Sequence, residues 1–255
     1  MITHVPILMY HSISHAGGPT SIPPEVFAAQ MRVIEDLKWD VVSLSCFCEW
    51  HCGRREFERP SLVITFDDGF KDFQTNAFPI LKAHGFPSTV FLPSQRLGAT
   101  ENWIGANQPP RALMDWATVI DLSSQGVDFA PHSRTHANLS QLQGASLFDE
   151  IIGAKDDLRA ILPNSPSHFA PPYGAISVEA LKVIGETYDL SVGVEFDLAT
   201  RKSLLFNLPR VEMLYYVNPM RFASLLRGEG RFYLEARKML RLVRRAFVKP
   251  PRSPY

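Results

Sequence analysis

The sequence has few cysteines. Its three, Cys46, Cys48 and Cys52, lie within seven residues of one another. An odd, clustered set does not form a disulfide framework, so we interpret these residues as reduced thiols. A zinc site that also uses His51 is disfavoured, because the spacing matches no zinc knuckle and a second pair of ligands is missing.

Signals for secretion and for membrane insertion are also lacking. The first six residues contain neither a basic segment nor a long apolar run, so they do not resemble a secretion signal. No apolar stretch reaches the roughly 18 residues that a membrane-spanning helix requires. These absences predict a cytoplasmic protein that does not cross a membrane.

The chain has no net charge, since 26 Lys and Arg balance 26 Asp and Glu, and nucleic acid is therefore not an expected partner. The exception is the segment from residue 231 to residue 255, where apolar residues alternate with eight basic residues and one acidic residue, Glu235. This segment is either an amphipathic helix on an anionic membrane surface or a closing helix with a solvated basic face. We predict a main domain at residues 1–228 and a basic helical extension at residues 229–255.

Strand-like and helix-like patterns alternate along the chain. Short apolar runs predict strands at residues 5–10, 41–44, 61–66, 88–92, 127–130, 169–170, 190–194 and 208–211. Helical patterns lie between most of them, at residues 24–38, 72–84, 111–124, 145–162 and 178–186. This alternation is typical of a parallel sheet with helical crossovers, and the chain length favours one closed or nearly closed barrel.

Polar side chains follow several of the predicted strands. In parallel barrels, residues just past the carboxyl ends of the strands form the site. We therefore take the residues at these positions as candidate site residues: His11, Asp67, Asp68, His132, His136, Tyr173 and Arg210.

The clearest signal is the apolar strand at residues 62–66, which ends at Asp67 and Asp68. Adjacent carboxylates there repel each other unless a cation, a proton or several donors meet them. His132 and His136 are four residues apart, so on a helical turn both rings face one way and suit one divalent ion shared with an aspartate. Such a site is typical of metal-assisted hydrolysis, with the second aspartate accepting a proton. A glycosidase is disfavoured, because its two carboxylates must stand roughly 5 Å or more apart.

Three short motifs resemble those of a known family. They are Thr-Phe-Asp-Asp-Gly at residues 65–69, His-Ser-Arg-Thr-His at residues 132–136 and Pro-Pro-Tyr-Gly at residues 171–174. In this order and at these separations, they resemble the first three motifs of the polysaccharide deacetylases of carbohydrate esterase family four. Leu-Met-Tyr-His at residues 8–11 and Leu-Met-Asp-Trp at residues 113–116 resemble the branch that deacetylates bacterial exopolysaccharides such as poly-N-acetylglucosamine. The resemblance implies a distorted (β/α)7 barrel.

The resemblance also implies a role for each motif residue. It makes Asp67 the general base and Asp68 a metal ligand with His132 and His136. The metal would be one divalent ion, zinc in the first instance, with cobalt and nickel as alternatives. Water activated by this metal would attack the carbonyl carbon of an N-acetyl group, and the metal and the backbone N–H of Tyr173 would hold the oxyanion. The substrate would be an N-acetylated oligo- or polysaccharide, and the products acetate and a free amine on the sugar.

The chain departs from the family pattern at three points. Ala170 stands where many members have an arginine that orients the base, and we expect Arg210 to replace it, since a guanidinium holds a carboxylate in a fixed two-pronged contact. No histidine follows His168 to protonate the leaving amine; either His11 does so or it shapes the pocket. The family's aspartate-tryptophan motif is not recognisable, and Asp197 is a weak stand-in.

We therefore predict a metal-dependent hydrolase that removes N-acetyl groups from an amino-sugar glycan. The departures leave two alternatives open. One is a catalytically weak or inactive relative that binds glycans, and the other is a deacetylase of a small or lipid-linked N-acetyl sugar. A lipid-linked substrate would agree with membrane contact through the basic extension.

Overall fold

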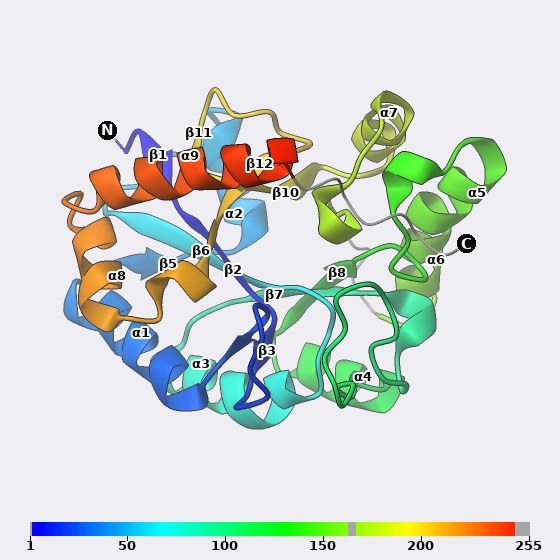
Figure 1. Cartoon of the computed structure of the whole chain (residues 1–255), viewed down its shortest axis with the longest axis horizontal. Coiled ribbons are helices and arrows are strands. Elements are labelled where there is room, and N and C mark those ends of the chain that lie inside the picture. The colour runs from blue at the N-terminus through cyan, green and yellow to red at the C-terminus, as the bar shows by residue number, and fades with distance from the viewer. Residues whose placement is uncertain (1, 163–166, 248–255) are drawn as a thin grey trace.

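The structure is a computed structural model that describes residues 2–162 and 167–247. A parallel sheet curves into a barrel with helices around its outside (Figure 1). Its strands lie in the order β8-β7-β6-β2-β12-β10-β9. Their bounds are β2 (Ile7–Tyr10), β6 (Ser61–Phe66), β7 (Thr89–Leu92), β8 (Asp128–Pro131), β9 (His168–Phe169), β10 (Leu190–Phe196) and β12 (Leu208–Glu212).

The two edges of this sheet meet. The backbone N–H of Ala170, after β9, donates to the carbonyl oxygen of Pro131 at the end of β8, with an N···O distance of 3.2 Å. The predicted distorted (β/α)7 barrel is therefore confirmed, as a barrel that is nearly closed. A further strand, β5 (Asp40–Val41), pairs with the start of β6. Short strands pair outside the barrel: β1 (His4–Val5) with β11 (Ala199–Thr200), and β3 (Ser12–Ile13) with β4 (Ser21–Ile22).

The described helices cover the strands and close the fold. In chain order they are α1 (Pro24–Asp36), α2 (Leu44–His51), α3 (Phe78–His84), α4 (Trp116–Ser124), α5 (Gly144–Phe148), α6 (Ala154–Arg159), α7 (Val178–Thr187), α8 (Pro219–Leu226) and α9 (Arg231–Phe247). In the described ranges, no helix has both the length and the apolar character to cross a membrane. The three cysteines, on and just after α2, are free thiols, as predicted.

One predicted helix is too long at its start. The pattern predicts a helix over residues 111–124, but α4 begins at Trp116, where the side chain of Asp115 accepts from the backbone N–H of Thr118. The preceding residues pair instead with extended backbone, since Leu113 forms a bridge with Phe70. Two other predicted helices contain a wider π-helical turn, at Phe73–Ala77 before α3 and at Asp149–Gly153 between α5 and α6.

Strand alternation divides the core into an outer and an inner layer. Outward residues of β2 and β6 pack with α1. Inward residues of the strands pack with Leu44, Phe47 and Trp50 of α2; they include Ile7, Val63, Phe91, Ala130 and Leu208. Farther along β6 and β12, the same inward positions hold Thr65 and Arg210, which are also fully buried. The inward face thus changes from apolar to polar toward the carboxyl ends of the strands.

Candidate active site

Asp67 and Arg210 face each other at the polar end of the barrel. Asp67 follows Val63 and Thr65 on the inward face of β6, and Arg210 follows Leu208 on the inward face of β12. The Nη1 and Nη2 atoms of Arg210 each donate to one carboxylate oxygen of Asp67, both at 2.7 Å. The sequence predicts this two-pronged contact.

Further hydrogen bonds fix the guanidinium itself. Its Nε donates to the carbonyl oxygen of Gly193 at 2.8 Å, and its Nη1 donates to Oγ1 of Thr65 at 3.1 Å. Burial by itself raises the pKa of Asp67, but the charge and hydrogen bonds of Arg210 outweigh it and hold the pKa below its usual value. Asp67 is therefore an ionised carboxylate in a fixed orientation.

Asp68 meets the two histidines of the second motif. Its Oδ1 lies 3.1 Å from Nε2 of His136 and 3.4 Å from Nε2 of His132. Donor atoms of these three buried residues all lie within 4.8 Å of one another. Burial raises the pKa of Asp68, but the hydrogen bonds from both histidines lower it well below its usual value. An ionised carboxylate and two imidazole nitrogens thus converge on one point.

This donor set fits a divalent metal ion. Nδ1 of His132 lies 2.7 Å from the carbonyl oxygen of Ala170. A carbonyl oxygen only accepts, so Nδ1 carries a proton, and Nε2 faces Asp68. Without a metal ion, Nε2 must also carry a proton to donate to the carboxylate; burial lowers the pKa of His132, but the hydrogen bond to Asp68 raises it above its usual value. A cation would take the place of that proton between Nε2 and the carboxylate. Two imidazoles and one carboxylate are ligands that zinc and related divalent ions use in catalytic sites.

The histidines do not lie on the helical turn that their spacing suggests, so that part of the prediction is wrong. Residues 132–136 form an irregular loop after β8. Ser133 and His136 have positive φ angles of 59° and 65°, which turn the chain so that both rings point to Asp68. Asp68 and Tyr173 also have positive φ, at 71° and 61°. Each such residue costs about 1 kcal/mol or more, and strain of this kind is concentrated at functional sites.

A brace behind the loop holds this conformation. Oε2 of Glu150 accepts from the backbone N–H groups of Arg134 and Thr135, at 2.9 and 3.0 Å. The guanidinium of Arg134 in turn donates to both carboxylate oxygens of Asp157, at 2.8 and 2.9 Å. Sequence reasoning missed Glu150 and Asp157, because they lie in a helical segment far along the chain and follow no strand.

Two aromatic rings border His136. The ring of Trp103 stacks on the imidazole with centroids 4.0 Å apart and an angle of 19° between the planes. Oη of Tyr173 lies 3.2 Å from Nδ1 of His136. Sequence reasoning missed Trp103, which belongs to the polar insertion after β7. The sequence feature that could have pointed to it is the pair of opposite charges at Glu101 and Arg111. Nε and Nη2 of Arg111 donate to the carboxylate oxygens of Glu101 at 2.7 and 2.8 Å and so anchor the base of this insertion.

His11 lies at the same end of the barrel. Its Nε2 is 3.9 Å from Oδ2 of Asp67, and 15% of its side chain is exposed. Met9 and Glu212 are paired across β2 and β12, so His11, two residues past Met9, emerges on the same side as Glu212. Burial raises the pKa of Glu212, although the charge of His11 opposes this. His11 therefore has carboxyl groups on both sides.

Two weaker candidates lie away from these residues. Asp197 forms an ion pair with Lys238 of α9 and so takes no part in the site.

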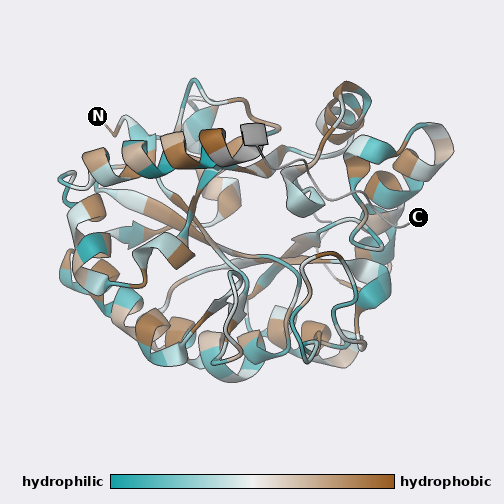
Figure 2. Cartoon of the chain, viewed as in Figure 1, coloured by the Kyte–Doolittle hydropathy of each residue, from teal (hydrophilic) through white to brown (hydrophobic). Residues whose placement is uncertain are grey.

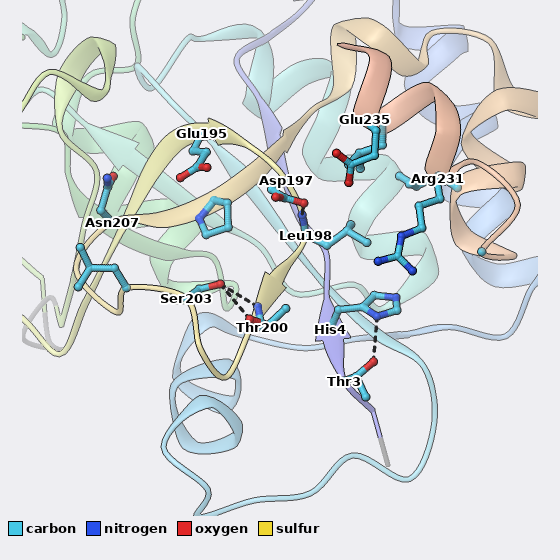
Figure 3. Close-up of a pocket in the computed structure, with 15 residues that line it drawn as sticks. Thr3, His4, Glu195, Asp197, Leu198, Thr200, Ser203, Asn207, Arg231 and Glu235 are labelled. Atoms are coloured by element: carbon cyan, nitrogen blue, oxygen red, sulfur yellow. Dashed lines mark hydrogen bonds between the residues drawn. The ribbon is translucent and has the colours of Figure 1, made fainter. Parts of the chain in front are cut away.

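Asp197 also lines a cavity of about 650 Å³ between α9 and the start of the barrel (Figure 3). This cavity contains none of the candidate site residues, and its wall mixes charged, polar and apolar side chains, including His4, Glu195 and Arg231. The cysteine cluster contributes no donor to the Asp68 group.

Comparison with known proteins agrees with this geometry. YxkH of Bacillus subtilis (strain 168), a protein named for the polysaccharide deacetylases, is 25% identical over 213 residues, which are 82% of this chain and 71% of that protein. Poly-beta-1,6-N-acetyl-D-glucosamine N-deacetylase of Escherichia coli (strain K12) is 24% identical over 233 residues, 75% of this chain but 33% of that enzyme. This chain thus matches about a third of the length of the E. coli protein.

Solved structures share the fold. The Streptococcus pyogenes deacetylase PplD, solved in complex with acetate, superposes with a TM-score of 0.75 at 23% identity, over 86% of this chain and 96% of that one. A family model described as polysaccharide deacetylase matches residues 54–188, more than half of the 255 residues. This chain is therefore a hydrolase of the polysaccharide deacetylase family.

Proposed function

We propose that this protein removes N-acetyl groups from an N-acetylglucosamine-type glycan and releases acetate. The observation that carries the proposal is the pairing of two units: Asp68, His132 and His136 as a metal-binding group, and Asp67 fixed beside it by Arg210. Relatives named for poly-N-acetylglucosamine and for chitin support this class of substrate.

The metal group is the first part of the proposal. Asp68, His132 and His136 would hold one divalent ion, for which zinc is the first candidate and cobalt and nickel are alternatives. Such an ion lowers the pKa of water and polarises a carbonyl oxygen. The carbonyl oxygen of Ala170 keeps the ring of His132 in the tautomer that presents Nε2. The main chain at Ala170 thereby supports the metal site, although its side chain is not the family's arginine.

Asp67 is the proposed general base. In the hydrolysis, water adds to the carbonyl carbon of the N-acetyl group, the C–N bond breaks, and acetate and an amine form. Asp67 accepts the proton that the water loses, and the amine nitrogen must gain one. His11, 3.9 Å from Asp67, is our candidate for the group that delivers this proton. Its position beside Glu212 allows it to be reprotonated within the site.

Tyr173 is the proposed donor to the developing oxyanion. The two prolines before it and its positive φ of 61° fix the peptide plane, and its hydroxyl contacts His136 at 3.2 Å. A backbone N–H held in this way costs no reorganisation during the reaction, which is the condition for oxyanion stabilisation. Trp103, stacked on His136, would exclude water from the same side of the site.

Metal analysis and acetate release test this proposal together. Asp68→Ala, His132→Ala and His136→Ala should lose both bound metal and acetate release from N-acetylglucosamine oligomers. Asp67→Asn should keep the metal and lose turnover by a factor of at least about a hundred, because general base catalysis contributes roughly 10²–10⁴-fold. An Asp67→Asn protein with full turnover would overturn the assignment of the base.

The second candidate function is glycan binding without turnover. The missing late histidine favours it, since the leaving amine then depends on His11. A binding protein would retain oligosaccharides, as measured by calorimetry, and release no acetate when loaded with zinc, cobalt or nickel. A screen of N-acetylglucosamine oligomers, peptidoglycan fragments and small N-acetyl sugars also decides between a polymer and a small substrate.

A further inference from the structure

Helix α9 turns apolar side chains away from the protein. Four of them are exposed: Phe232 (86%), Met239 (59%), Leu240 (60%) and Val243 (51%). Because an α-helix turns about 100° per residue, these four lie within an arc of about 100° on one face. Apolar segments recur along the whole of α9, which crosses one side of the molecule (Figure 2). The four exposed apolar side chains thus lie along one face of the helix, and we call this face the α9 stripe.

Beyond the first turn, the side of α9 that faces the barrel is largely polar. Lys238 forms an ion pair with Asp197, and Nη2 of Arg241 donates to the carbonyl oxygen of Val194 at 3.1 Å. The guanidinium of Arg237 lies over the ring of Tyr215, 4.8 Å from its centroid. Three basic side chains therefore attach α9 to the barrel, which reverses the usual arrangement of a surface helix.

The first turn of α9 is the part that packs on the apolar core: Leu234 is buried there, with 2% of its surface exposed, and Tyr233 packs beside it. Arg231, Leu234 and Glu235 also border the cavity shown in Figure 3. An apolar helix face would gain free energy by packing inward, yet here it is held outward. This arrangement indicates that the stripe has a partner outside the described residues.

The charge around the stripe identifies the partner. Residues 231–255 contain eight basic residues and one acidic residue. On the helix, Arg231 and Glu235 lie to one side of the stripe and Arg237 to the other, while Lys238 is paired with Asp197 and adds no free charge. A second copy of this helix would bring like charges together, whereas an anionic lipid surface offers opposite charges beside an apolar layer.

We propose that α9 binds the surface of an anionic lipid bilayer, with the helix in the membrane plane and the α9 stripe among the lipid chains. This inference goes beyond deacetylation and does not depend on it. Residues 229–255 would then be an attachment segment, distinct in function from the barrel. Because α9 packs on β10, the neighbour of β12, attachment would keep the site that contains Arg210 close to the bilayer.

Vesicle binding by the full chain tests the proposal. The protein should sediment with vesicles of phosphatidylcholine and phosphatidylglycerol, and at least tenfold more weakly with phosphatidylcholine alone. High salt should weaken the binding to the mixed vesicles, since it screens the charged part of the interaction. No binding to the mixed vesicles would overturn the proposal, and so would equal binding to both compositions.

Variants of exposed residues locate the contact. Phe232→Gln, Met239→Gln and Val243→Gln together should reduce binding to the mixed vesicles by at least tenfold. The matched control, Val178→Gln with Leu204→Gln, removes side chains that are 88% and 55% exposed elsewhere, and it should bind as the wild type does.

The outcomes separate membrane binding from the alternatives and from catalysis. Unchanged vesicle binding by the triple variant would overturn the proposal. So would a wild-type protein that binds no vesicles but forms a dimer, if the triple substitution abolishes that dimer. Acetate release from a soluble oligosaccharide should be the same in the triple variant and the wild type. Since the vesicle assay needs neither metal nor substrate, its failure and the failure of the proposed deacetylation are distinguishable.

Discussion

Removal of the Arg210 guanidinium is the most informative perturbation, because this side chain links the barrel interior to the proposed base. Arg210→Ala deletes two hydrogen bonds to Asp67, one to Thr65 and one to Gly193. It also leaves the carboxylate of Asp67 buried without its counter-charge. Loss of one partner of a buried ion pair costs about 3–5 kcal/mol, so the free energy of unfolding should fall by about that amount.

Turnover should fall as well. Without the two-pronged contact, Asp67 no longer has a fixed orientation, and a displacement of about 1 Å costs on the order of a hundredfold in rate. Bound metal should remain, because the hydrogen bonds of Arg210 reach Asp67 and not the Asp68 group. The assay is the initial rate of acetate release at saturating glycan, with bound metal and chemical denaturation measured on the same preparation.

Two control variants separate positioning from general destabilisation. Arg210→Lys keeps the charge but is unable to bridge both oxygens, so it should recover part of the stability and little of the turnover. Arg201→Ala removes a guanidinium that pairs with Glu56 beside α2, and it should leave turnover unchanged. The reasoning is refuted if fully folded, metal-loaded Arg210→Ala turns over within threefold of the wild type.

Three further predictions concern the surroundings of the site. Trp103→Ala should lower kcat/KM about three- to tenfold, because it removes the ring stacked on His136, whereas Trp103→Phe should retain most of the wild-type kcat/KM. An equal loss of kcat/KM in the two variants would contradict the stacking role. Burial raises the pKa of Glu101, but the hydrogen bonds and charge of Arg111 outweigh burial and hold this pKa below 4.5. The Glu101–Arg111 pair therefore stabilises the fold at higher pH, and this contribution is lost as the pH falls through the pKa of Glu101 in the folded protein. Glu101→Gln should therefore lower the free energy of unfolding in urea by about 3 kcal/mol near pH 7, and the difference from the wild type should shrink below pH 4.5. A difference that stays constant with pH would contradict this reasoning. His11→Asn should keep the metal and lower acetate release at least tenfold if His11 delivers the proton, and unchanged release would limit it to shaping the pocket.

Local chemistry explains why much of the site was accessible from sequence. An apolar run of strand length that ends in two carboxylates identifies a strand end, and in a parallel barrel the strand ends share one rim. Asp67, Asp68, His132 and Arg210 could therefore be grouped although they are far apart along the chain. The expectation for Arg210 came from the family resemblance: many members have an arginine where this chain has Ala170, and Arg210 lies at a late strand end.

Other features depend on contacts that have no local signature. The histidine spacing suggests a helical turn. Hydrogen bonds with Glu150 and Asp157 hold residues 132–136 in an irregular loop instead, so tertiary contacts override the local pattern. Trp103 reaches His136 because the Glu101–Arg111 pair folds back the insertion, and no periodicity encodes that return.

The sequence by itself determined the barrel, the strand ends that form its rim and the chemical types of the residues there, because strand periodicity and side-chain chemistry are local properties. Only the tertiary structure decided other contacts: Ala170 with His132, Glu150 with the loop at residues 132–136, and three basic side chains of α9 with the barrel. It also decided that the apolar side of α9 faces outward. The amphipathic pattern has two faces, and which of them is buried depends on the partners that the fold brings to it.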